Sequence, residues 1–119
     1  MLRKMKHTHI RTLVQDLKKT AAEKKAPLWK RVAEDLNKPT SKRRVVNLSR
    51  IDRYANAQDT VLVPGKVLSM GDLTKKVTVV AYQFSGKARE KIESSGSKTM
   101  TITELMEKNP KGAKVRIFG

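Results

Sequence analysis

The clearest strand pattern in the chain is VTVVAYQF, residues 77–84. Its apolar side chains fall at consecutive as well as alternate positions, the pattern of a strand that is covered on both faces. Ser85 follows as a helix cap, and Ala88 and Ile92 are the apolar positions of a helix that ends at Ser95-Gly96. A doubly covered strand that runs directly into a helix predicts a mixed α/β fold.

The residues before this strand predict a helical hairpin over residues 8–37. Thr8 is a suitable N-cap, and apolar residues from Ile10 to Ala21 recur at spacings of three and four. Pro27 suits the first position of a second helix. The buried face of that helix is expected to hold Leu28, Trp29, Val32, Ala33 and Leu36. Trp29 therefore reads as a core residue, although its basic neighbours leave base stacking as the alternative.

The remaining boundaries follow from charge and turn residues in a single domain, residues 1–119. Residues 1–7 lack an apolar stripe and are expected to form a basic arm that is disordered in the free protein. Residues 38–44 are a polar basic loop, and residues 45–119 an α/β core. Within this core we predict strands or extended segments at 45–48, 60–63 and 115–118. We also predict a short helix capped by Ser49 and a helix at 103–109. Turns are expected at Pro64-Gly65, 70–72 and 110–112.

Charge is the most informative property of the composition. The 119 residues include 27 Lys and Arg against 11 Asp and Glu, a formal net charge of +16. Such an excess opposes compaction and favours a polyanionic partner, and nucleic acid is the natural one because Lys and Arg release its condensed counterions. No apolar run approaches the length of a spanning helix and no lipidation motif is present, so a membrane partner is not expected.

The residue types that carry catalysis or metal binding are scarce. The chain has no Cys and two histidines, His7 and His9, so we expect no metal centre, no disulfide and no cofactor. The pair Glu34-Asp35 reads as part of a solvated helix face. Ser85-Gly86-Lys87 resembles a phosphate-binding loop but lacks its other residues, which leaves a simple helix cap or one RNA phosphate as alternatives. A small-molecule substrate is therefore not expected.

The strongest basic segment runs from Lys38 to Arg53, where six cations accompany one acid, Asp52. Because solubility alone needs far less charge, we interpret this segment as an RNA contact. Arg50 and Arg53 share one face of the short helix, with Ile51 and Tyr54 expected on the adjacent packed face. The full set of predicted RNA-binding residues is Arg3, Lys4, Lys6, Arg11, Lys30, Arg31, Lys38, Lys42, Arg43, Arg44, Arg50, Arg53, Lys66, Lys75 and Lys76.

Several motifs in order carry a family resemblance. They are NLSRIDRY at 47–54, VPGKVL at 63–68, MGDLTKKVTV at 70–79 and FSGKA at 84–88. Together they resemble the archaeal and eukaryotic large-subunit ribosomal protein family of the "eighteen-e" type. Residues 65–97 are also similar to the C-terminal domain of the bacterial large-subunit protein fifteen. The length of the chain suits the archaeal branch.

The resemblance implies an irregular β-β-α superhelical core with a helical N-terminal segment. It also implies a structural protein, not an enzyme, that binds large-subunit ribosomal RNA beside neighbouring ribosomal proteins, supports assembly and translation, and resides in the cytoplasmic ribosome. The competing classes are a free-standing nucleic-acid-binding module, such as a chromatin or regulatory protein, and a small enzyme. A DNA-reading module should show a recognition helix, and the first two predicted helices lack a convincing one.

Overall fold

A parallel β-sheet organises the fold. The computed structural model describes residues 2–38 and 43–118, with side chains from residue 10 onward. In these residues the sheet has five strands: β1 (Arg44–Asn47), β2 (Thr60–Leu68), β3 (Thr78–Phe84), β4 (Lys98–Thr101) and β5 (Val115–Ile117). Their order is β1-β2-β3-β4. Strand β5 pairs with the N-terminal end of β2, whereas β1 pairs with its C-terminal end. All the pairings are parallel.

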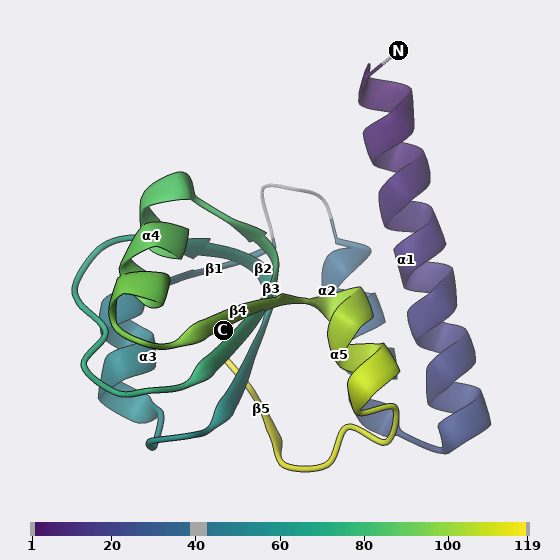
Figure 1. The fold of residues 1–119 in the computed structure, drawn as a ribbon. Coiled ribbons are helices and arrows are strands. Elements are labelled where there is room, and N and C mark those ends of the chain that lie inside the picture. The colour runs from purple at the N-terminus through teal and green to yellow at the C-terminus, as the bar shows by residue number, and fades with distance from the viewer. Residues whose placement is uncertain (1, 39–42, 119) are drawn as a thin grey trace.

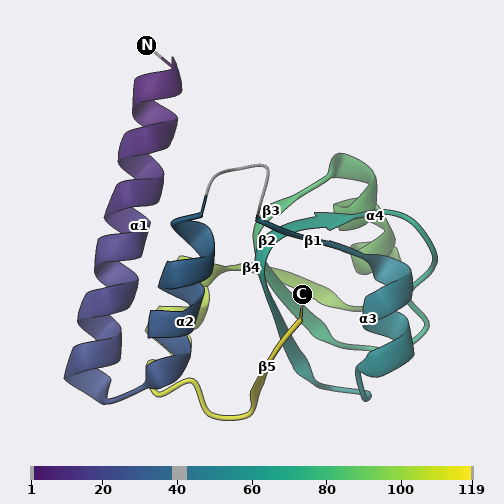
Figure 2. The ribbon, with the colours of Figure 1, turned by 180° about the vertical axis from the view of Figure 1, so that it is seen from behind.

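Helices cover both faces of the sheet, which makes the fold three-layered (Figures 1 and 2). One face carries α3 (Leu48–Tyr54) and α4 (Gly86–Ser94), and the other carries α1 (Leu2–Lys24), α2 (Pro27–Leu36) and α5 (Ile102–Lys108). On β3, Val79 and Ala81 belong to the core under α3 and α4, whereas Val80 belongs to the core under the other three helices. Alternate side chains of a strand point to opposite faces, so the predicted doubly covered strand and the mixed α/β class are confirmed.

The helical hairpin is confirmed, but its first helix begins earlier than expected. Leu13, Val14 and Leu17 are buried against α2, and Pro27 occupies the first turn of that helix. The predicted start at Thr8 is wrong, because α1 extends back to Leu2. The expected disordered arm is therefore the start of this helix from Leu2 onward. Residues 2–9 contain neither Gly nor Pro, and extending a nucleated helix adds one hydrogen bond for each residue fixed.

The expected turn at Pro64-Gly65 is also wrong, since β2 runs straight through it. Its pairing with β3 shifts register between Val63 and Lys66, and such an irregularity accommodates a proline without a ladder N–H. Gly65 lies opposite Arg44 of β1, and a Cβ at Gly65 would overlap the carbonyl oxygen of Arg44. The two residues serve a close strand contact here and not a reversal of the chain.

The structure corrects three smaller expectations. The helix α3 begins at Leu48 with Asn47 as its N-cap, so Ser49 lies inside it. The helix α5 begins at Ile102, one residue before its predicted start. Strand β4 was not predicted, because its four residues are mostly polar and none is buried. In contrast, the Ser85 cap is confirmed: its hydroxyl oxygen accepts a hydrogen bond of 3.1 Å from the backbone N–H of Ala88.

Trp29 lies in the core, as predicted. Its side chain is fully buried in the cluster beneath α1, α2 and α5. The indole Nε1–H donates a 2.7 Å hydrogen bond to the carbonyl oxygen of Pro110 in the turn before β5. This bond joins the helical hairpin to a residue 81 positions away, and base stacking by Trp29 is excluded by its burial.

Candidate nucleic-acid interface

A small apolar face holds α3 on the sheet. Leu48 and Ile51 are fully buried, and Ala55, directly after the helix, is buried as well. Side chains three and four residues apart occupy one side of a helix, so these three define the packed side. Arg50 and Arg53 lie away from it and are exposed. The sequence therefore fixes which side of α3 faces outward.

Tyr54 was expected on the packed face with Ile51, and this expectation is wrong. The tyrosine is 51% exposed. Each residue advances about 100° around a helix, so Tyr54 lies about 60° from Ile51, in the direction of Arg50. With Leu48, Ile51 and Ala55 already filling the packed face, the ring remains at its edge.

The outward face of α3 is an arginine and tyrosine cluster, formed by Arg50, Arg53 and Tyr54. The guanidinium carbons of Arg50 and Arg53 lie 5.3 Å and 5.6 Å from the centroid of the Tyr54 ring. Both distances are within the range of cation–π attraction. Among the described residues, neither guanidinium forms an ion pair with a carboxylate. Two permanent positive charges are thus presented to solvent.

The two acids closest in sequence to this cluster are bound elsewhere. The Asp52 carboxylate accepts hydrogen bonds from the backbone N–H of Thr74 at 2.7 Å and from its hydroxyl at 2.8 Å, which lower the pKa of Asp52. Asp59 accepts from the backbone N–H of Asn56 at 2.8 Å and from Arg116 at 3.0 Å, and these bonds lower the pKa of Asp59. Both carboxylates are engaged with donors outside the cluster, and neither pairs with Arg50 or Arg53.

Two other arginines of the predicted RNA-binding set have partners within the protein. The Nε–H of Arg43 donates to the carbonyl oxygens of Leu36 and Lys38, both at 3.2 Å, at the end of α2. The Nε of Arg44 lies 3.7 Å from a carboxylate oxygen of Asp35. Asp35 is only 5% exposed, so the expectation that it belongs to a solvated face is wrong. Arg43 and Arg44 thus help to join α2 to β1.

Lys75 and Lys38 are similarly engaged. The Nζ of Lys75 donates a 2.7 Å hydrogen bond to the carbonyl oxygen of Ala55, the residue that follows α3. Lys38 pairs with Asp35 at 3.2 Å, although about half of its side chain remains exposed. Both lysines contribute to the fold and to the surface charge at the same time.

The remaining residues of the set do not gather at α3. Arg11, Lys30 and Arg31 are exposed on α1 and α2, across the sheet from the arginine and tyrosine cluster. Lys66 and Lys76 are exposed on β2 and in the segment before β3. Arg3, Lys4 and Lys6 lie in the first turns of α1. Lys42 lies outside the described residues.

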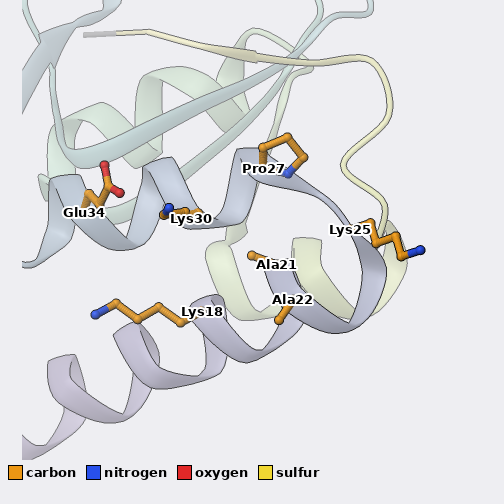
Figure 3. A pocket seen from close by; sticks show the side chains of 7 residues that line it. All are labelled: Lys18, Ala21, Ala22, Lys25, Pro27, Lys30 and Glu34. Atoms are coloured by element: carbon orange, nitrogen blue, oxygen red, sulfur yellow. The ribbon is translucent and has the colours of Figure 1, made fainter.

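A hollow of about 670 Å³ lies between α1 and α2, beside several of the basic residues. Figure 3 shows small residues and lysines along this hollow, with Ala21 and Ala22 on α1 and Pro27 at the start of α2. The lining residues are Lys18, Ala21, Ala22, Lys25, Pro27, Lys30 and Glu34. Lys18 and Lys25 were absent from the predicted set. Lys18 lies three and four residues before Ala21 and Ala22 on α1, and Lys25 directly follows the end of that helix. The groove has a single carboxylate, so it lacks the paired acids of general acid and base catalysis.

Within residues 2–38 and 43–118, the side chains that the structure describes, from residue 10 onward, include no group of three or more His, Cys, Asp and Glu that could hold a metal ion. Among these same ranges, no helix combines the length and the apolar character needed to cross a membrane.

Similarity to known proteins identifies the family of this chain. Residues 2–118 match the family model described as "Ribosomal protein 60S L18 and 50S L18e". The chain belongs to this family. Large ribosomal subunit protein eL18 of Methanococcus maripaludis is 47% identical over 119 residues, covering 98% of this chain and 99% of the relative. The eL18 proteins of Methanopyrus kandleri and Archaeoglobus fulgidus are 45% and 47% identical, over 94% and 90% of this chain and 92% of each relative.

This L18e membership confirms the "eighteen-e" resemblance and its archaeal branch. The matched range begins at residue 2 and ends at residue 118, so it includes every helix and strand of the fold. The similarity of residues 65–97 to the bacterial protein fifteen stays a prediction. The family assignment also separates this chain from the competing classes, a small enzyme and a chromatin or regulatory protein.

Proposed function

We propose that the outward face of α3 is the principal RNA contact of this protein, with Arg50 and Arg53 binding phosphates of large-subunit ribosomal RNA. As an L18e protein, the chain is a structural component of the large ribosomal subunit and not an enzyme. It acts in the ribosome of the cytoplasm, where it stabilises folded RNA beside neighbouring large-subunit proteins and supports assembly and translation. The implied β-β-α superhelical description of the core remains a prediction from the resemblance.

The observation that carries the proposal is the contrast between the arginines. Arg43 and Arg44 have oxygen partners within the protein, whereas Arg50 and Arg53 have none among the described residues and are exposed. A planar guanidinium can bind phosphate in a bidentate fashion, and an unpaired exposed one does so without first breaking an ion pair. Arg50 and Arg53 are therefore the best candidates of the predicted set, and Arg43 and Arg44 secondary ones.

The remaining predicted residues supply a second, more diffuse contribution. Arg11, Lys30 and Arg31 lie on the opposite side of the sheet from α3, so one flat RNA surface cannot meet both sets. A protein of net charge +16 inside a folded RNA can meet phosphates on several sides. We propose that the α1 and α2 cations, including Lys18 and Lys25 beside the groove, contact separate RNA segments.

The test is the salt dependence of affinity for large-subunit ribosomal RNA. Each phosphate contact on a duplex contributes roughly 0.9 to the slope of log affinity against log salt. Replacing Arg50 and Arg53 by Gln should weaken binding several-fold or more and reduce the slope by about 1.8. The matched control replaces Lys87 and Arg89 of α4 by Gln. It removes the same charge from an exposed helix on the same face of the sheet.

Exposed substitutions usually change stability by only about 0.5 kcal/mol, so we expect both variants to remain folded. Circular dichroism checks this and thereby separates a loss of binding from a loss of folding. Equal losses of affinity in the two variants would show that binding is diffuse and that α3 has no special role. Unfolding of the Arg50 and Arg53 variant would show that these side chains serve the fold.

A further inference from the structure

One aromatic ring of this protein is placed differently from the others. The chain has five aromatic residues: Trp29, Tyr54, Tyr82, Phe84 and Phe118. Tyr54 is the exposed one, at 51%, while Trp29 and Phe118 are buried and the other two are partly buried. Leaving an aromatic ring half in water forgoes burial that a small domain could use. Its position therefore suggests a partner.

The ring is framed by cationic side chains. Arg50 and Arg53 lie over it at 5.3 Å and 5.6 Å. A guanidinium plane is itself a stacking surface for nucleobases, and its N–H groups bind phosphate. A base that stacks on Tyr54 would thus find its own phosphates beside two positive charges.

A shallow hollow adjoins the ring and has a fixed polar wall. Its volume is about 240 Å³, and it is lined by Arg50, Tyr54, Arg116, Ile117 and Phe118. Arg116 is held in place because its Nη1–H groups donate to the carbonyl oxygen of Tyr54 at 3.1 Å and to Asp59 at 3.0 Å. Small-molecule pockets usually begin at roughly 300 Å³, so this hollow suits one planar ring better than a larger cofactor.

The charge of the surroundings favours RNA over a protein partner. Asp52 and Asp59, the nearest acids in sequence, are already engaged with Thr74 and Arg116. The cluster therefore presents aromatic and cationic groups alone, which complement a base and its phosphates. Unpaired bases in loops and bulges are the parts of folded RNA that stack on protein aromatic rings.

The geometry points to Tyr54 as the stacking site for one unpaired base of the ribosomal RNA, with Arg50 and Arg53 holding the flanking phosphates. This inference rests on the proposed function and adds to it: the α3 contact recognises an extruded nucleotide as well as backbone charge. It assigns a binding role to a tyrosine that sequence patterning placed in the packed face.

Three variants of the full chain separate stacking from charge. Tyr54→Leu removes the π-face and keeps apolar volume, Tyr54→Phe keeps the ring and removes only the hydroxyl, and Arg50→Gln with Arg53→Gln removes charge. The affinity of each for large-subunit ribosomal RNA is measured at several salt concentrations. Chemical probing of base reactivity accompanies each measurement.

Stacking predicts that Tyr54→Leu weakens binding by about 5- to 100-fold with an unchanged salt slope, whereas Tyr54→Phe stays within about twofold of the parent. It also predicts one base that the parent and Tyr54→Phe protect and that Tyr54→Leu leaves reactive. An unchanged affinity and protection pattern for Tyr54→Leu would overturn the stacking site. If the arginine variant still lost affinity and slope, the proposed phosphate contact would stand alone.

Two further outcomes are diagnostic. If the arginine variant and Tyr54→Leu both bind like the parent, the proposed function of α3 fails together with the stacking site. If Tyr54→Leu binds isolated RNA normally but is not incorporated into large subunits, the ring faces a neighbouring protein and the stacking site is refuted. Far-UV circular dichroism establishes that each variant is folded before these results are read.

Discussion

The ion pair between Asp35 and Arg44 offers a sharp test of how α2 is joined to β1. The side chain of Asp35 is 7% exposed and that of Arg44 34%, with 3.7 Å between the Nε of Arg44 and a carboxylate oxygen of Asp35. At an effective dielectric constant of about 20, two charges at this distance attract by roughly 4 kcal/mol. Desolvation of Asp35 and the partial exposure of Arg44 offset most of this attraction, which leaves a net coupling of about 1–2 kcal/mol.

A double-mutant cycle measures that coupling. We expect Asp35→Asn to lower the free energy of unfolding by about 1.5–3 kcal/mol, since it also weakens the partly exposed pair with Lys38. Arg44→Gln should lower it by about 1–2 kcal/mol, because it leaves the buried carboxylate of Asp35 with Lys38 as its one remaining cation among the described residues. The double variant should be more stable than the sum of the single losses predicts, by about 1–2 kcal/mol.

The assay is urea denaturation followed by far-UV circular dichroism, with the coupling taken from the four unfolding free energies. Losses that add to within about 0.5 kcal/mol would show that the two side chains do not interact energetically. That result would refute the structural role of Arg44 and return it to the list of free phosphate ligands. Arg44→Lys serves as the control, because it keeps the positive charge but removes the planar guanidinium group.

Three further predictions concern the fold. Trp29→Phe removes the bond to Pro110 and part of a fully buried ring, so it should cost about 1.5–3 kcal/mol in urea denaturation, and a loss below about 0.5 would contradict this packing. Thr101→Ala removes the capping box of α5 and should cost about 1 kcal/mol, seen as a melting temperature lower by about 4 °C; an unchanged value would argue against the cap. Hydrogen bonds from Thr74 lower the folded-state pKa of Asp52, so its contribution is present above the unfolded pKa and is lost as the pH falls through the folded one. Asp52→Asn should therefore reduce the loss of stability between pH 6 and pH 3, and an identical loss in both proteins would contradict the shift.

The parts of the fold that the sequence predicted are those with a local signal. Strand β3 carries a run of apolar residues, and the two helices of the hairpin carry stripes at helical spacing. The Ser85 cap likewise depends on residues only three positions apart. In each case the side chains that make the pattern also make the contact, so the pattern was sufficient.

The errors share a different cause, which is dependence on distant neighbours. Pro64-Gly65 has the composition of a turn, but the closeness of β1 is the reason for the glycine. Strand β4 is short and mostly polar, and its backbone pairs with β3 nevertheless. Local patterning cannot reveal either neighbour, because both come from other parts of the chain.

The sequence predicted the positive charge of the candidate site, but only some of the positions and partners of its arginines. Arg50 and Arg53 were correctly placed on one face, since residues three apart on a helix are neighbours. The engagement of Arg43 and Arg44 could not be predicted, because their partners lie at the end of α2 and on the buried Asp35. The composition gives the number of cationic residues, but only the fold shows which of them already have oxygen partners.

If α3 faces ribosomal RNA, hydroxyl radicals generated at this helix should cleave that RNA. The chain contains no cysteine, so single cysteines can be introduced at exposed Ser49 of α3 and, as a control, at exposed Thr103 of α5 across the sheet. An iron chelate attached to each cysteine generates hydroxyl radicals within the assembled large subunit. We predict strong, localised cleavage of large-subunit RNA from position 49, and weaker cleavage at different nucleotides from position 103. Absence of cleavage from position 49 in fully assembled subunits would contradict it.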